Sequence, residues 1–88
     1  YYGVFSFSKN NKTRYFVKIH VNGDLIVGTY SSEVEAAIAY NKAGNILKAQ
    51  GINKEFYQNY IWELNSLEYQ AIYEKIKIRK SIKNYTTK

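Results

Sequence analysis

The stretch GTYSSEVEAAIAYNKAG, residues 28–44, restricts the possible folds of this chain more than any other feature. Ser32 followed three residues later by Glu35 predicts a capping box at the start of a helix, and Gly51 is typical of the residue that ends one. The predicted packing stripe has the i, i+3, i+4 spacing of a helix and consists of Ala36, Ala37, Tyr40, Ala43, Gly44 and Leu47. Such small side chains let the helix backbone lie close to a sheet. We therefore expect one helix lying flat on one sheet face, with the other face open.

Three segments rich in β-forming residues precede this helix. They are YGVFSF (2–7), RYFVKIHV (14–21) and LIVGTY (25–30). A polar turn is expected over residues 8–13, and VNGD at residues 21–24 is typical of a hairpin. The sequence therefore predicts an α+β fold, in which a three-stranded antiparallel sheet is packed on one face by an α-helix.

The second hairpin allows two registers. A two-residue loop at Asn22–Gly23 would place Asp24 on the apolar side of the strands. A three-residue loop over residues 21–23, with Gly23 at positive φ, pairs His20 with Asp24 and keeps the carboxylate out of the core. We prefer the second register because it keeps Asp24 out of the core. In the second register, the face away from the helix carries Lys18, His20, Asp24 and Ile26.

Composition excludes several kinds of site. The 88 residues are enough for one domain with a modest core, and they include no Cys and a single His, His20. Disulfides, thiolate metal sites and a zinc site are therefore not expected, and no cofactor is expected. No apolar run approaches the roughly 20 residues of a membrane helix, and no signal peptide is evident. Because residue 1 is Tyr and Met is absent, we expect a piece of a longer protein.

Positive charge is concentrated at the two ends of the chain. The net charge is +6, and residues 75–88 carry six basic side chains and no acidic one. Residues 1–30 carry four basic side chains against Asp24, whereas residues 51–74 are acidic overall. This distribution favours a polyanionic partner. A solvated surface with a basic tail explains it equally well.

Residues 54–88 are expected to form an extension with an additional C-terminal helix and a basic tail. Ser66 is the predicted N-cap of that helix, and Tyr60 and Trp62 are the predicted packing anchors. Its expected apolar stripe consists of Leu67, Tyr69, Ile72, Tyr73 and Ile76. The extension either braces the first helix or covers the open sheet face. We prefer bracing because the acidic 51–74 stretch would repel DNA if it covered that face.

Three motifs resemble the Apetala-two/ethylene-response-factor DNA-binding domain. They are YYGV (1–4), VGTY (27–30) and SEVEAAIAYNKA (32–43), and the resemblance covers residues 1 to about 53. It implies a three-stranded antiparallel sheet backed by one helix, with the open sheet face in the DNA major groove. Versions of the family also occur in bacteria and viruses, often beside homing-endonuclease or integrase domains.

This chain departs from the family's pattern in the first two strands. The family's first-strand arginines fall on Tyr2 and near Phe5 and Phe7. Its second-strand glutamate falls on Lys18, and its second-strand arginine falls on His20. The contact residues of the first two strands are therefore replaced.

The third strand departs in the same way. The family's arginine falls near Asp24, and its tryptophan falls on Ile26. Since the guanine-binding arginines are missing, we do not expect a GC-rich target.

We expect sequence-specific binding of double-stranded DNA through the open face, as a transcription factor or as the DNA-targeting module of a larger protein. The expected contact residues are Tyr2, Phe5, Phe7, Lys9, Lys12, Arg14, Phe16, Lys18, His20 and Ile26. Phenylalanine and isoleucine would contact thymine methyls, Lys18 and Arg14 would reach guanine edges or phosphates, and Lys9 and Lys12 would contact the backbone.

Two other functions would use the same aromatic face. One is a protein–protein interaction module, and the other is a platform on which single-stranded nucleic acid stacks. Catalysis is not expected in these residues, because the chain has one His, one Asp, no Cys and no Gly-rich phosphate loop. With DNA as the expected partner, we expect an intracellular protein, nuclear in a eukaryote and cytoplasmic in a bacterium or phage.

Overall fold

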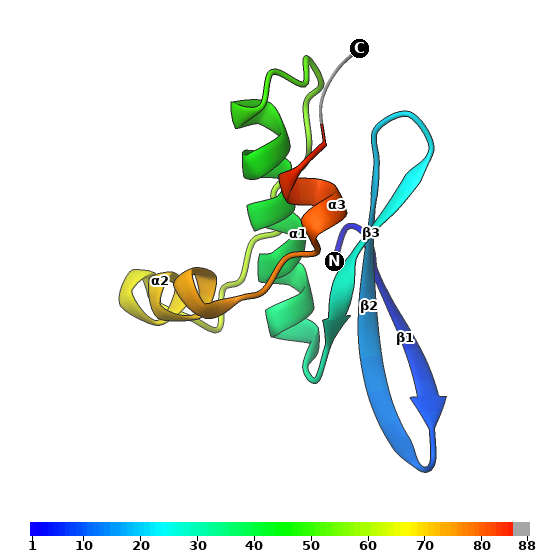
Figure 1. Ribbon diagram of the computed structural model, residues 1–88. Helices are drawn as coiled ribbons and strands as arrows, with labels where there is room; N and C mark the ends of the chain where they lie inside the picture. Colours follow the sequence, from blue (N-terminus) through cyan, green and yellow to red (C-terminus); the bar gives the residue numbers. More distant parts are fainter. Residues whose placement is uncertain (86–88) are drawn as a thin grey trace.

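A computed structural model describes residues 1–85 and contains two layers, a sheet and a group of helices (Figure 1). Strands β1 (Val4–Lys9), β2 (Lys12–His20) and β3 (Asp24–Tyr30) form one antiparallel sheet in the order β1-β2-β3. Helices α1 (Glu33–Ala49), α2 (Ser66–Lys75) and α3 (Lys80–Lys83) follow. Helix α1 crosses one sheet face, which confirms the predicted α+β architecture. Within residues 1–85, no helix has the length and apolar character needed to cross a membrane.

The hairpin between β1 and β2 is tighter than the sequence predicts. The turn consists of Asn10 and Asn11, whose φ angles are 52° and 62°. The flanking pairs Ser8–Thr13 and Lys9–Lys12 belong to the ladder, so the expected polar turn lies within residues 8–13 but is confined to Asn10 and Asn11. Two residues suffice because asparagine tolerates the left-handed conformation that a type I′ turn requires.

The hairpin between β2 and β3 has the predicted register. His20 pairs with Asp24, and Gly23 lies at φ 97° in the three-residue loop. Further along, a β-bulge interrupts the ladder, since Lys18 pairs with Ile26 while Val17 pairs with Gly28. The bulge shifts the register of the rest of β3 by one residue. Thr29 then pairs with Phe16 and Tyr30 pairs with Tyr15, so Thr29 and Tyr30 lie on opposite faces of the sheet.

Helix α1 begins and ends as the sequence predicts. The Ser32 Oγ accepts a hydrogen bond from the Glu35 N–H at 3.1 Å and donates one to the Glu35 carboxylate at 2.9 Å. At the other end Gly51 has φ 93°, and the Ile52 N–H donates to the Leu47 carbonyl at 3.1 Å, as in a Schellman motif. The predicted stripe is buried except for Tyr40, which is half-buried. This face packs on Val17, Ile19 and Val27 of the sheet.

Residues 52–65 run along α1 without regular structure and are held by two buried amides. The Asn41 Nδ2 donates to the Asn59 carbonyl at 2.9 Å, and the Asn59 N–H donates to the Asn41 Oδ1 at 2.6 Å. The predicted anchors are wrong, because Tyr60 is 80 % exposed and Trp62 is 75 % exposed. Neighbouring side chains of this extended segment face opposite sides, so Asn59 and Ile61 point inward instead.

Helix α2 packs against α1 on the side away from the sheet (Figure 1). Its N-cap is Asn65, which forms a full capping box with Glu68, so the expected N-cap at Ser66 is wrong by one residue. Within the predicted stripe, Leu67 is 83 % exposed, while the other four members are half-buried or buried. The Lys42 ammonium donates to the Tyr73 carbonyl at 2.7 Å and to the Ile76 carbonyl at 3.2 Å. The extension therefore braces α1.

After α2 the chain turns back to the edge of β3. The Arg79 N–H donates to the Val27 carbonyl at 3.0 Å, and the Tyr30 hydroxyl donates to the Lys77 carbonyl at 2.7 Å. Helix α3, which the sequence did not predict, follows and buries Ile82. The predicted basic tail lies partly within this ordered segment, and its residues 86–88 lie outside the described part of the chain.

Candidate nucleic-acid interface

The sheet face opposite α1, here called the open face, carries nine of the ten predicted contact residues. Alternation along the paired strands places them there. Its members are Phe5, Phe7 and Lys9 from β1, Lys12, Arg14, Phe16, Lys18 and His20 from β2, and Asp24, Ile26 and Thr29 from β3. Of these, Thr29 was not predicted, because only the bulge brings it opposite Phe16.

Three phenylalanines form the centre of the open face. The rings of Phe5 and Phe16 pair across β1 and β2 with centroids 5.3 Å apart and planes 21° apart. The Phe7 ring lies diagonally, 5.9 Å from that of Phe16. Phe5 is 47 % exposed and Phe7 is 38 % exposed, so their partners among residues 1–85 leave much of each ring open to solvent. A clustered apolar surface of this kind on a sheet is typical of a binding site.

Lys18 adds a positive charge to this cluster. Its ammonium nitrogen lies 5.3 Å from the centroid of the Phe5 ring and 5.8 Å from that of Phe16. At these distances the cation is attracted to the ring faces. The cation–π contacts hold the charge in the middle of the face. Ile26, the cross-strand partner of Lys18, is half-buried beside it.

The His20 end of the face contains its single carboxylate. The His20 Nδ1 lies 3.2 Å from the Asp24 Oδ1, and both side chains are largely exposed. The Lys54 ammonium donates to the His20 carbonyl at 2.6 Å, which brings a further cation to this end. The imidazole therefore contacts the local carboxylate, and a lysine is bound to the backbone of His20.

The opposite end is the projecting hairpin of β1 and β2, which extends beyond α1 (Figure 1). Lys9 and Lys12 pair next to its turn, and both are exposed. On the reverse side of the hairpin, Ser6, Ser8 and Thr13 are also exposed. This part of the sheet is consequently a two-stranded ribbon with both faces free of α1.

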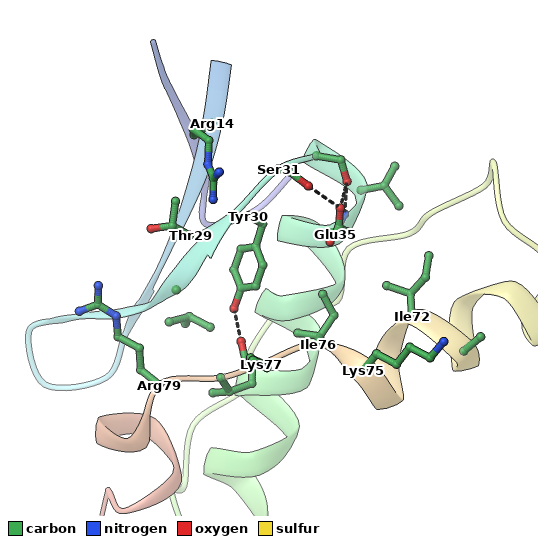
Figure 2. Close-up of a pocket in the computed structure, with 16 residues that line it drawn as sticks. Arg14, Thr29, Tyr30, Ser31, Glu35, Ile72, Lys75, Ile76, Lys77 and Arg79 are labelled. Atoms are coloured by element: carbon green, nitrogen blue, oxygen red, sulfur yellow. Dashed lines mark hydrogen bonds between the residues drawn. The ribbon is translucent and has the colours of Figure 1, made fainter. Parts of the chain in front are cut away.

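Arg14 lies outside the phenylalanine cluster and lines a groove at the edge of β3 (Figure 2). The groove has a volume of about 1080 Å³ and lies between residues 27–35 and residues 71–79. On its floor, burial raises the pKa of Tyr30 to about 12, and the nearby Arg79 guanidinium opposes part of that rise. The groove and its C-terminal wall were not predicted, because nothing in the sequence shows where residues 75–79 return.

Tyr2 is the predicted contact residue that the structure separates from the others. Its ring stacks on Tyr57 with centroids 5.0 Å apart. Its backbone N–H donates to the Asn59 Oδ1 at 2.6 Å, and its carbonyl accepts from the Asn59 Nδ2 at 3.1 Å. Asn59 also donates to the Ala37 carbonyl of α1, so Tyr2 is tied to the helical layer.

Acidic side chains are concentrated outside the open face. The open face carries Lys9, Lys12, Arg14 and Lys18, with Asp24 as its one acid. The remaining acids belong to α1, to α2 and to the segment joining them, and they are Glu33, Glu35, Glu55, Glu63, Glu68 and Glu74. Throughout residues 1–85, no three His, Cys, Asp or Glu side chains gather in a way that could hold a metal ion.

Comparisons with protein-family models, curated proteins and solved structures give no match for this chain.

Proposed function

We propose that the chain binds double-stranded DNA by placing the open face in the major groove. The observation that carries this proposal is the exposed phenylalanine cluster surrounded by four cationic side chains, on the sheet face that α1 leaves uncovered. The apolar centre offers contacts to bases, and the surrounding cations offer contacts to phosphates. The placement of the acidic side chains supports the same partner, because six of the seven acids lie outside the open face.

The projecting hairpin fits this partner in shape. The major groove is roughly 12 Å wide and admits a two-stranded β-ribbon. Since the hairpin extends beyond α1, it can enter the groove without the helix meeting the DNA backbone. The order of three strands and one helix is also the order that the Apetala-two resemblance implies.

Specific side chains then have separate roles. Phe5 and Phe7 contact thymine methyls, while Lys18 reaches guanine acceptors from the middle of the face. Lys9 and Lys12 contact phosphates at the tip of the hairpin. With phenylalanine near two positions of the family's first-strand arginines and histidine at its second-strand arginine, the target contains A·T pairs rather than a GC-rich core. A DNA-targeting or transcription-regulating module follows as the biological role.

Single-stranded nucleic acid is the second candidate, because exposed phenylalanines on a sheet can stack on bases. The geometry favours it less than duplex binding. Phe5 and Phe16 stack on each other, so each ring has a face already occupied. A protein partner for the same surface is distinguished by its weak dependence on salt.

Selection from a random double-stranded library, at low and moderate salt, tests the proposal. We expect one enriched motif, and we expect the double variant Phe5→Ala, Lys18→Ala to bind it at least about tenfold more weakly. The matched control is Tyr60→Ala, Lys48→Ala, which removes one exposed aromatic and one lysine away from the open face. Equal losses in the two double variants, or tighter binding to the single strand than to the duplex, would contradict the proposal.

A further inference from the structure

We propose that the groove at the edge of β3 is a second DNA contact, in which Arg14, Lys77 and Arg79 hold the phosphate backbone beside the open face. The inference rests on the proposed DNA partner and adds to it the C-terminal segment, which lies outside the part of the chain that resembles the Apetala-two family. It assigns a role to the basic residues near the C-terminus.

The C-terminal wall of the groove includes residues 76–79, which are packed and hydrogen-bonded against β3. In IKIR, residues 76–79, the isoleucines are buried and the two basic residues are exposed. The Arg79 N–H is bonded to the Val27 carbonyl, and the Lys77 carbonyl is bonded to the Tyr30 hydroxyl. Hydrogen bonds before and after Ile78 thus set the position from which both basic side chains extend.

The two walls present arginines toward one space. Figure 2 shows Arg14 on the strand side and Arg79 on the C-terminal side, with Thr29 on the edge of β3 between them. The guanidinium group presents several N–H donors in a planar fork that matches phosphate oxygens. Thr29 supplies a hydroxyl beside them, and backbone contacts of this kind fix the register of a protein on DNA.

The charges of these three residues are free to bind an external anion. In the part of the chain that the structure describes, no carboxylate lies within 4.0 Å of Arg14, Lys77 or Arg79. Glu35 also lines the groove, but its Oε1 accepts hydrogen bonds from the Ser31 hydroxyl at 3.0 Å and from the Ser32 hydroxyl at 2.9 Å. The Glu35 carboxylate is therefore hydrogen-bonded within the start of α1.

The position at a sheet margin identifies which anion fits. Phosphate backbones border the major groove on both sides, so a sheet placed in the groove meets a backbone at its margin. β3 is such a margin, and the open face continues into the groove through Thr29. A duplex that contacts Phe16 from above can therefore place a phosphate between Arg14 and Arg79.

Two measurements test the second contact. In the first, Lys77→Gln, Arg79→Gln is compared with the wild type for the slope of log Kd against log salt concentration. We expect the magnitude of the slope to fall by about 1.8, since each lost phosphate contact contributes about 0.9. Binding weakens by a similar factor for all sequences, and the enriched motif stays the same. Lys80→Gln is the control, because Lys80 lies next to Arg79 and does not line the groove.

In the second measurement, amide chemical shifts are followed while a short duplex that carries the enriched motif is added at low salt. Changes at Thr29 and Arg79 support the second contact, whereas changes at Phe5 and Phe16 report the open face. Changes at the open face alone overturn the second contact and leave the proposed function standing. Changes at the groove alone keep the phosphate contact and overturn base reading, and changes at neither overturn both. A slope for the double variant that matches Lys80→Gln also overturns the second contact.

Discussion

Removing the Asn59 side chain should weaken the whole fold, because this one amide joins the N-terminus, α1 and the C-terminal extension. Its Oδ1 accepts from the Tyr2 N–H at 2.6 Å, and its Nδ2 donates to the Tyr2 carbonyl at 3.1 Å and to the Ala37 carbonyl at 3.2 Å. Asn59 is 6 % exposed. Asn59→Ala therefore removes three hydrogen bonds from a nearly dry site.

Each such bond contributes a net ~1 kcal/mol, and a buried partner left unsatisfied costs more. We expect Asn59→Ala to lower the free energy of unfolding by about 3 kcal/mol, a large part of the roughly 5–15 kcal/mol that a domain has. Asn59→Asp should cost more than alanine, because it loses both donated bonds and buries a charge. Amide exchange should accelerate at Tyr2 and over residues 56–62 before it does in the sheet.

Urea unfolding followed by circular dichroism measures this change. Gln58→Ala is the matched control, since Gln58 is exposed and donates a single long hydrogen bond of 3.4 Å to the Asn45 Oδ1. We expect the control to change stability by less than about 0.5 kcal/mol. If Asn59→Ala costs no more than Gln58→Ala, the Asn59 side chain does not anchor residues 52–65.

Three other changes have expected outcomes. Because burial raises the pKa of Tyr30 in the folded state, its contribution to stability is complete below pH 10 and is lost as the pH rises toward about 12; melting temperatures of Tyr30→Phe should fall less steeply over that interval than those of the wild type. Asn11→Gly should raise the free energy of unfolding by about 0.5 kcal/mol, because Asn11 has φ 62° in a type I′ turn that favours glycine there; a loss of stability on denaturant titration would contradict the assigned turn. Gly3→Ala should cost at least about 2 kcal/mol, because Gly3 has φ 72° and an added Cβ would overlap the Tyr40 ring and lie 2.6 Å from the Lys18 carbonyl oxygen; an unchanged denaturation midpoint would show that Tyr40 moves aside freely.

Local signals predicted the sheet register and the first helix. The Asp24 carboxylate could not be buried, and this alone selected the three-residue loop that the structure contains. Ser32 and Gly51 fixed the ends of α1, because capping depends on residues close together in the chain. Most of the candidate site followed directly, since alternation in β1 and β2 determines which side chains share a face.

Features that depend on distant partners were not predictable from one sequence. The hydrophobic pattern of β3 fits a ladder with or without the bulge at Val27. The Val27 carbonyl accepts its hydrogen bond from the N–H of Arg79, which is distant in the sequence. Asn59 gives no local signal of burial, because its partner Asn41 lies on α1. The outward position of Trp62 follows from that same inward Asn59, three residues before it.

The hydrogen bond between Arg79 and Val27 also affects how the chain avoids aggregation. An uncovered strand edge is a template for pairing with another chain, and β3 is one of the two edges of this sheet. Residues 76–82 cover that edge, but they leave the ribosome only after the whole sheet. During synthesis, and in any fragment that ends before residue 76, β3 presents its backbone to other chains. Residues 76–82 therefore protect the β3 edge from pairing with other chains. Deleting them should cause self-association under conditions in which the fold is still intact.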